Sequence, residues 1–362
     1  MKIALNAMTM SETKAGVGNY AWHVIRELQQ NPGEHQFTVY VNETVKHLFS
    51  DSEQMKFVAP GSFSSSKKRL LFELTKLGKI LNREGYDFLH FLDYATPLQA
   101  LNAPFFVTVH DVSFFASADY FTKSMSMTKK SLLPLSCKRA VGVITVSEFT
   151  KRELLRYVKL SEDKIHPVLL GTEPPRTDGE GGEPCVLCVG TVEPRKDQIT
   201  AIKAMELLWK EHPEFTLPLV IAGKAGWRYE PIFQYAERSP FCDRIHFTGY
   251  CTEKQLAGWY RGAKVFLFPS LYEGFGLPPL EAMSYGVPVV ASNAASLPEV
   301  LGNGAILCPI GEEKAFAKGI LDALGNDTLI ASGRKRAAEL SWKKTAAELL
   351  AQYQRIAERS RT

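Results

Sequence analysis

The sequence predicts an α/β fold in two domains, each built on a parallel β-sheet covered by helices. The chain has 362 residues, and a prior of roughly 150 residues per domain gives two domains. Short apolar runs alternate with amphipathic helical patterns throughout, as expected for a parallel sheet with covering helices. A segment rich in glycine and proline interrupts this alternation at 171–184. We therefore expect an N-terminal domain over 1–170, a linker over 171–184, a C-terminal domain over 185–340 and a terminal helix within 341–362.

Composition restricts the class of protein. Hydrophobic residues make up 45% and charged residues 23% of the chain, which is typical of a soluble globular enzyme and excludes disordered and fibrous classes. No apolar run approaches the roughly 20 residues that span a bilayer, and the N-terminal run is too short for a signal peptide. The six cysteines are scattered without the spacing of a zinc site, so we expect buried free thiols and a cytoplasmic location: Cys137, Cys185, Cys188, Cys242, Cys251 and Cys308.

Charge is distributed unevenly. The net charge is +4, with +5 in residues 1–170 and −1 in the remainder. Lysine and arginine cluster at 67–69, 129–130 and 138–139. These clusters are either solvated helix faces or a surface for anionic lipid or a phosphorylated acceptor, possibilities that the sequence leaves open. We expect no nucleic-acid partner.

In the N-terminal half, polar and glycine residues follow the predicted strands. Strands are expected at 3–5, 37–41, 56–58, 88–92, 105–109 and 141–146, with helices from Tyr20 to Leu28, through Leu70 to Leu81, and between 122 and 140. Gly16 and Gly18 follow the first strand, where they either let the backbone approach a phosphate or sugar or form a plain tight turn. His110 and Asp111 follow another strand, and Ser147 is placed to cap a helix starting near Phe149.

The C-terminal half repeats the alternation. Strands are expected at 186–189, 219–222, 245–247, 265–268 and 287–291, and helices at 199–209, 229–236, 253–261, 278–285, 313–324 and 345–359. Thr252 and Gln255 have the spacing of a capping box, which supports a helix start at 253.

The loop between the apolar strand Val265–Phe268 and the next helix carries the strongest local signal. Its glycines permit close backbone approach, and the amides of Gly274, Phe275, Gly276 and Leu277 add to the helix dipole to favour an anion. Glu273 and Glu281 flank this loop. We expect Glu281 in the first turn of the helix, where a glutamate is also favourable for the dipole alone.

Eight segments together resemble the GT-B glycosyltransferases, specifically the retaining family 4. They are Gly16–Gly18, His110–Asp111, Val146–Thr150, Val189–Lys196, Phe247–Gly249, Phe268–Glu281, Gly286–Ser292 and Leu297–Val300. The resemblance covers nearly the whole chain. It implies two doubly wound Rossmann-like domains facing across a cleft, with the C-terminal helix packing back on the N-terminal domain.

The resemblance also implies roles for residues of a nucleotide-sugar site. Arg195 and Lys196 would stabilise the leaving diphosphate, since arginine forks two phosphate oxygens and lysine adds a point charge. Glu281 would accept hydrogen bonds from the ribose diol, Glu273 would lie near the donor sugar, and His110 would face that sugar from the other domain.

The resemblance implies further contacts to the phosphate, the base and the acceptor. Gly16 and Gly18 would approach the β-phosphate or acceptor, and Gly249 and Tyr250 would lie near the base. For the acceptor we expect contacts from residues at the ends and loops of the N-terminal sheet: Asp111, Phe114 and Tyr120. Asp111 would serve equally well to cap a turn, and the two aromatic side chains would serve equally well in a membrane interface or in small core clusters.

The implied activity is retaining transfer of a hexose to a glycan or lipid-linked acceptor in surface polysaccharide synthesis. The segment Gly190–Lys196 resembles bacterial polysaccharide mannosyltransferases, which favours GDP-mannose over UDP- or ADP-sugars. The resemblance also implies a front-face mechanism, in which the leaving phosphate takes the acceptor proton. The sequence has no Asp-x-Asp motif, so we expect activity without metal or other cofactor. Thr191 stands where many members have arginine, so we expect one phosphate contact to be lost or shifted to Arg195. The alternatives are a sugar-nucleotide epimerase or glycogen-type synthase, and a non-catalytic binding relative.

Overall fold

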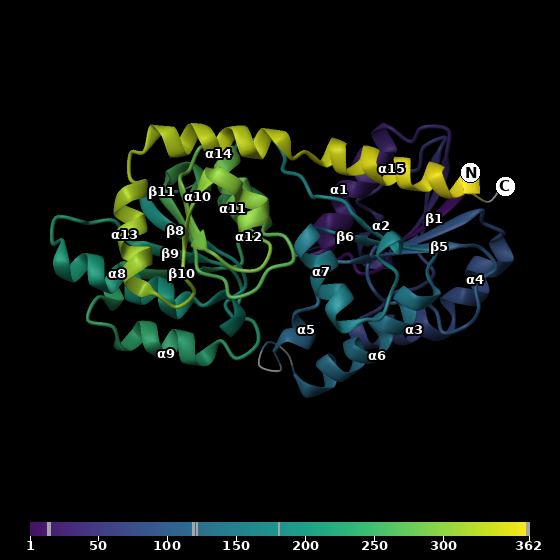
Figure 1. Ribbon diagram of the computed structural model, residues 1–362, viewed down its shortest axis with the longest axis horizontal. Helices are drawn as coiled ribbons and strands as arrows, with labels where there is room; N and C mark the ends of the chain where they lie inside the picture. Colours follow the sequence, from purple (N-terminus) through teal and green to yellow (C-terminus); the bar gives the residue numbers. More distant parts are fainter. Residues whose placement is uncertain (13–15, 118–119, 121, 180–181, 360–362) are drawn as a thin grey trace. The chain divides into compact units, whose positions relative to one another are not determined.

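The structure is a computed structural model that describes residues 1–12, 16–117, 120, 122–179 and 182–359, with the side chains of 357–359 excepted (Figure 1). It divides into two compact units. The first comprises residues 1–115, 123–170 and 342–362, and the second comprises 116–122 and 171–341. The stretch that the sequence predicts as a linker groups with the second unit.

The first unit is built on a seven-stranded parallel sheet with the order β3-β2-β1-β4-β5-β6-β7. Its strands are β1 (Lys2–Asn6), β2 (Gln36–Tyr40), β3 (Met55–Val58), β4 (Phe88–Phe91), β5 (Phe105–Val109), β6 (Gly142–Thr145) and β7 (Ile165–Pro167). β1 pairs in parallel with both β2 and β4, so the order of strands reverses between β1 and β4. Such a reversal leaves a crevice at the carboxyl ends of the two strands.

Helices of the first unit follow the sheet strand by strand. They are α1 (Val17–Gln30), α2 (Glu43–Lys46), α3 (Ser66–Thr75), α4 (Leu77–Glu84), α5 (Ser113–Ala116), α6 (Lys123–Arg139), α7 (Glu148–Tyr157) and α15 (Trp342–Arg359). The Ser147 hydroxyl accepts from the Thr150 amide at 3.0 Å, which confirms the predicted cap of α7.

The C-terminal helix α15 belongs to the first unit and lies beside α1 (Figure 1). The Trp342 indole stacks on the His23 ring at 4.6 Å between centroids. Farther along the helix, the fully buried Tyr353 hydroxyl lies 2.6 Å from Nδ1 of His90 in β4. The expected return of this helix to the N-terminal domain is confirmed.

The second unit holds a six-stranded parallel sheet with the order β10-β9-β8-β11-β12-β13. Its strands are β8 (Cys185–Val189), β9 (Leu219–Ala222), β10 (Ile245–Gly249), β11 (Ala263–Phe268), β12 (Val289–Ser292) and β13 (Ala305–Cys308). Its helices are α8 (Gln198–Glu211), α9 (Glu230–Arg238), α10 (Glu253–Gly262), α11 (Leu277–Ser284), α12 (Leu297–Leu301), α13 (Glu313–Ala323) and α14 (Asp327–Glu339). The capping box of Thr252 and Gln255 is confirmed at the start of α10.

Several local expectations were wrong or incomplete. The single helix predicted through Leu70–Leu81 is two helices, because the chain leaves helical geometry at Lys76, where φ is −115°. The apolar spacing continues across this break, so periodicity alone does not reveal it. Of the helices and strands given above, six were not predicted: the edge strands β7 and β13 and the helices α2, α5, α12 and α14. α14 packs through the small Gly333 against Met283, which leaves little apolar pattern to read.

The cysteines are only partly as expected. All six are free thiols; four are buried, whereas Cys242 is exposed and Cys251 is half-buried. In the part of the chain that the structure describes, no group of three or more His, Cys, Asp or Glu side chains is arranged to hold a metal ion.

Candidate functional site

The main candidate site lies at the strand-order reversal of the second sheet. β8 and β11 are neighbours and run parallel, so their carboxyl ends lie at the same edge of the sheet. Arg195 and Lys196 follow β8, and Glu273 follows β11. The fold thus brings together charged residues 77 positions apart in the sequence, at the place where open α/β sheets bind ligands.

Four charged side chains meet there, and we name Glu193, Arg195, Lys196 and Glu273 the switch-point cluster. Nζ of Lys196 lies 2.5 Å from Oε1 of Glu273, and Nη1 of Arg195 lies 3.2 Å from Oε2 of the same carboxylate. The Arg195 guanidinium also donates to Oε1 of Glu193 at 2.7 Å and to the Tyr272 carbonyl at 2.7 Å. The sequence placed both cations and Glu273 in one site but did not predict that they pair directly.

Burial and the neighbouring charges shift the pKa values of Glu273 and Lys196. Glu273 is only 8% exposed. Burial by itself would raise the Glu273 pKa, but Lys196 and Arg195 outweigh it and hold the pKa below its usual range. Burial, against the attraction of Glu273, lowers the pKa of Lys196 from its usual value. The carboxylates thus hold two cations at a fixed position, the preorganisation that electrostatic stabilisation of a developing anion requires.

Serines secure the loop that carries Glu273. The Ser270 hydroxyl donates to Oε1 of Glu273 at 2.5 Å. The Ser296 hydroxyl lies 2.9 Å from the Glu273 carbonyl and 2.8 Å from the Phe275 carbonyl. In addition, the Leu271 amide donates to the Arg195 carbonyl at 2.8 Å, which joins the two loops directly. Sequence reasoning missed both serines; Ser270 lies within a segment that carried the family resemblance, and Ser296 directly precedes another.

The helix after this loop begins one residue earlier than predicted, which corrects the placement of Glu281. Gly276 caps α11 with φ +106°, and a Cβ there would lie 2.6 Å from the Leu297 side chain. Since α11 starts at Leu277, Glu281 is its fifth residue, and the first turn contains no acidic residue. The helix dipole acts mainly within the first turn, so it does not account for this glutamate.

Two glycines that follow β9, together with Gly249 at the end of β10, bring further backbone to the same edge. A Cβ at Gly223 would lie 1.9 Å from the Gly190 carbonyl, and one at Gly226 would lie 2.4 Å from the Thr191 methyl group. Thr191 therefore packs against the segment after β9. The predicted base-contact residues follow next in the sheet: the Gly249 carbonyl accepts from the Gly223 amide at 2.9 Å, and Tyr250 is 53% exposed.

His110 follows β5 in the first unit. Its Nε2 lies 2.9 Å from the Leu92 carbonyl, which only accepts, so Nε2 carries the hydrogen. Burial lowers the His110 pKa even though Asp93 opposes this effect. The ring is therefore neutral, with Nδ1 as an acceptor, and it packs edge-on against Tyr20 at 4.8 Å.

The three residues predicted to contact the acceptor substrate lie in different environments. Oδ1 of Asp111 accepts from the Ser113 amide at 2.9 Å, so Asp111 does cap the turn before α5. Phe114 is 1% exposed, which makes it part of the core rather than a surface for stacking. Tyr120 lies in the short segment that groups with the second unit.

The glycine loop after β1 is described from residue 16 onward, and its earlier residues 13–15 lie outside the described chain. Gly16 caps α1 with φ +53°, whereas Gly18 is buried in α1 and a Cβ there would have ordinary contacts at 3.6 Å or more. Only Gly16 has a conformation that requires glycine.

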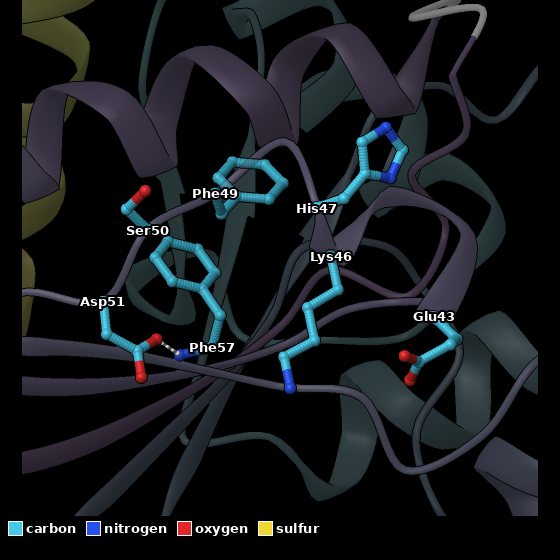
Figure 2. Close-up of a pocket in the computed structure, with 7 residues that line it drawn as sticks. All are labelled: Glu43, Lys46, His47, Phe49, Ser50, Asp51 and Phe57. Carbon is cyan, nitrogen blue, oxygen red and sulfur yellow. Dashed lines mark hydrogen bonds between the residues drawn. The ribbon is translucent and has the colours of Figure 1, made fainter.

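A separate hollow in the first unit lies beside α2 and β3 (Figure 2). Phe49 and Phe57 stack at 4.6 Å in its wall, and the Asp51 carboxylate accepts from the Phe57 amide at 2.9 Å. Lys46 and Glu43 line it from α2. None of the site residues predicted from the sequence lines this hollow.

The two doubly wound sheets are those of a GT-B glycosyltransferase, and comparison with known families agrees. Residues 172–341 match the glycosyl transferases group 1 family, and residues 15–174 match glycosyltransferase family 4. The chain belongs to this glycosyltransferase family and is a glycosyltransferase.

Its relatives include enzymes of bacterial surface polysaccharides. The chain is 33% identical to the O-antigen chain mannosyltransferase B of Escherichia coli over 68% of its own length and 69% of that protein. It is 31% identical to the serotype-specific mannosyltransferase WbdA of Escherichia coli over 58% of its own length but only 28% of that protein. The structure of sucrose-phosphate synthase from Thermosynechococcus elongatus superposes with a TM-score of 0.81, covering 99% of both chains at 21% identity. This last similarity supports the GT-B fold alone.

Proposed function

We propose that the chain transfers mannose from GDP-mannose to a hydroxyl of a glycan or lipid-linked acceptor, with retention of anomeric configuration, in surface polysaccharide synthesis. The observation that carries the proposal is the switch-point cluster at the reversal of the second sheet. A transferase whose leaving group is a diphosphate needs fixed positive charge beside that group. The named activities of the O-antigen relatives support mannose as the sugar.

The proposed reaction needs no nucleophile from the protein. The bond between the anomeric carbon and the phosphate oxygen breaks, and the acceptor oxygen bonds to the anomeric carbon on the same face. The departing phosphate oxygen takes the acceptor proton. Arg195 and Lys196 would stabilise the charge on that oxygen, and the neutral His110 would accept a hydrogen bond from a sugar hydroxyl through Nδ1.

A thermal-shift comparison of GDP, UDP and ADP tests the donor. Ligand binding to the folded state raises the unfolding temperature by mass action, so we expect the largest rise with GDP. A larger rise with UDP or ADP would overturn GDP-mannose as donor. Absence of any rise with all three would overturn the nucleotide-sugar assignment.

Turnover of GDP-mannose tests the reaction. With a lipid-linked glycan acceptor, we expect turnover that persists in EDTA, because protein cations would neutralise the diphosphate. Loss of turnover that only Mg²⁺ or Mn²⁺ restores would contradict the metal-independent mechanism. Consumption of donor without any acceptor would instead favour an epimerase.

We further propose peripheral contact of the first unit with the anionic inner face of the cytoplasmic membrane. No helix in the described chain is long and apolar enough to cross a bilayer. On α3, Leu71 is 62% exposed and follows the exposed lysines 67 and 68; on α6, Met127 is 71% exposed between Lys123 and Lys130. Exposed apolar side chains beside cations suit an anionic interface.

Co-sedimentation with vesicles tests this contact. We expect binding to vesicles containing phosphatidylglycerol, weakened by the K67E/K68E variant and by high salt. Equal binding to neutral and anionic vesicles, or none to either, would contradict it.

A further inference from the structure

Glu281 is held by a tyrosine from the neighbouring helix. The Tyr260 hydroxyl, on α10, donates to Oε2 of Glu281 at 2.9 Å and also lies 3.3 Å from the Pro278 carbonyl in the first turn of α11. Tyr260 is 2% exposed. A single side chain thus contacts both the start of α11 and the carboxylate one turn into it.

Tyr260 is itself held on its other side. Its ring stacks on Tyr285 at 5.2 Å between centroids with an interplanar angle of 26°. The Tyr285 hydroxyl accepts from the Arg176 amide at 2.9 Å. Arg176 lies in the segment by which the chain enters the second unit, and its guanidinium pairs with Asp178 and Glu253. The position of Tyr260 is therefore fixed by contacts from two other segments.

In the hydrogen bond between Tyr260 and Glu281, the tyrosine hydroxyl is always the donor and the carboxylate always the acceptor. Burial, together with the adjacent Glu281 carboxylate, raises the Tyr260 pKa well above its usual value, so the hydroxyl remains a donor throughout the working range. A carboxylate offers about four acceptor positions, so the bond from Tyr260 is compatible with hydrogen bonds from a ribose diol. Its effect is to restrict the rotation of the Glu281 side chain.

We propose that Tyr260 is a positioning residue for nucleotide recognition: it orients the Glu281 carboxylate so that the enzyme discriminates ribonucleotides from 2′-deoxynucleotides. This inference rests on the proposed function, in which Glu281 binds the ribose. Tyr260 itself does not touch the nucleotide. A site built to accept a hydroxyl donor rejects a ligand lacking that donor only if the acceptor is held in place.

Binding of matched nucleotides to the full-length chain tests the inference. The probes are GDP, UDP and ADP, each with its 2′-deoxy counterpart, measured by calorimetry without donor sugar or acceptor. For the diphosphate that binds, we expect the wild type to prefer the ribonucleotide by roughly tenfold, the order of one hydrogen bond to a charged group. In Tyr260→Phe this preference should fall below about threefold, with the loss mainly in affinity for the ribonucleotide.

Four further variants separate the positioning role of Tyr260 from general damage to the fold. Tyr235→Phe is the matched control, because the hydroxyl of Tyr235, on α9 of the same unit, also donates to a carboxylate, Oε2 of Glu206 on α8, at 3.1 Å. It should retain the full preference. Glu281→Gln should lose the preference, and adding Tyr260→Phe to it should change nothing more. Tyr285→Phe, which removes only the bond from Arg176, should show a partial loss and provides the measurement if Tyr260→Phe folds poorly.

The outcomes are distinguishable. If no nucleoside diphosphate binds the wild type, the proposed function fails and this inference fails with it. If one binds without preference for the ribose form, the role of Glu281 fails. If the wild-type preference survives in both Tyr260→Phe and Tyr285→Phe, the positioning role of Tyr260 is wrong while the proposed function stands.

Discussion

The two units each bury a glutamate at the strand-order reversal of their sheet, yet they stabilise it differently. Glu273 in the second unit contacts two cations and a serine hydroxyl, and its pKa is lowered. Glu73 in the first unit is 1% exposed; it accepts from Asn6 at 3.0 Å and has Arg69 at 3.4 Å. Burial raises the pKa of Glu73 to about 7.

This difference shows that the number and closeness of cations decide the charge state of a buried carboxylate, since both glutamates are about equally buried. In the second unit, two adjacent cations favour the charged form of the buried Glu273. In the first unit, burial favours the neutral forms of Glu73 and His110.

The largest effect is expected from removing Lys196. Lys196→Ala should make Glu273 resemble Glu73, with a raised pKa and a loss of about 2–3 kcal/mol in unfolding free energy, because one partner of a buried ion pair is lost. It should also reduce kcat/KM by about 30- to 1000-fold, or about 2–4 kcal/mol. Calorimetry and donor turnover measure the two effects.

The double variant K196A/E273Q provides the control for Lys196. It removes the uncompensated charge, so we expect most of the stability to return while activity stays low. Recovery of activity together with stability would show that Lys196 acts only through folding, which contradicts its assignment to the phosphate.

The next largest effect concerns Glu73 and pH. Because its folded pKa of about 7 exceeds the usual value of 4.5, the folded state binds more protons between these values. The contribution of Glu73 to the free energy of unfolding is therefore most favourable below about pH 4.5. It falls as the pH rises to about 7 and remains lower above that. Glu73→Gln should remove this loss and stabilise the chain at pH 8 by on the order of 2 kcal/mol, with little change at pH 4.

Thermal unfolding of wild type and E73Q at both pH values measures the difference. An equal effect of the substitution at pH 4 and pH 8 would mean that Glu73 keeps its charge as Glu273 does, and the contrast between the units would disappear.

A smaller effect is expected for His110. His110→Ala should lower turnover about tenfold, the order of one neutral hydrogen bond. Since burial lowers its pKa, the active neutral form persists as pH falls through 6.5. The wild-type pH-rate profile should therefore show no His110-dependent loss between pH 8 and 6.5, and a loss in this range that H110A abolishes would contradict the neutral state.

The smallest effect is expected at the glycine loop of the first unit. Gly16→Ala should cost about 1 kcal/mol, because a non-glycine residue is strained at φ +53° even where space is open. Gly18→Ala is the matched control and should be neutral or slightly stabilising, as a helical glycine with ordinary contacts. Equal unfolding temperatures for the two variants would show that the loop relaxes.

Local signals in the sequence were sufficient for most of the fold and for the family. Apolar periodicity located most strands, and the caps at Ser147 and Thr252 depend on residues only three positions away. These local signals failed where the apolar pattern is weak, as at α14, and where it continues across a break between two helices, as at Lys76. The alternatives left open for Asp111 and Phe114 could not be resolved locally, because a cap and a core position depend on what packs around them.

The sequence by itself determined the alternation of strands and helices, the family and the segments that carry the candidate site, since each of these is encoded in neighbouring positions. Only the tertiary structure decided that Lys196 and Arg195 pair with Glu273, that α11 begins at Leu277, and that Tyr260 holds Glu281. The physical reason is that ion pairs and hydrogen bonds depend on distances of a few ångströms between side chains. Those distances are set by which strands are neighbours in the sheet and not by separation along the chain.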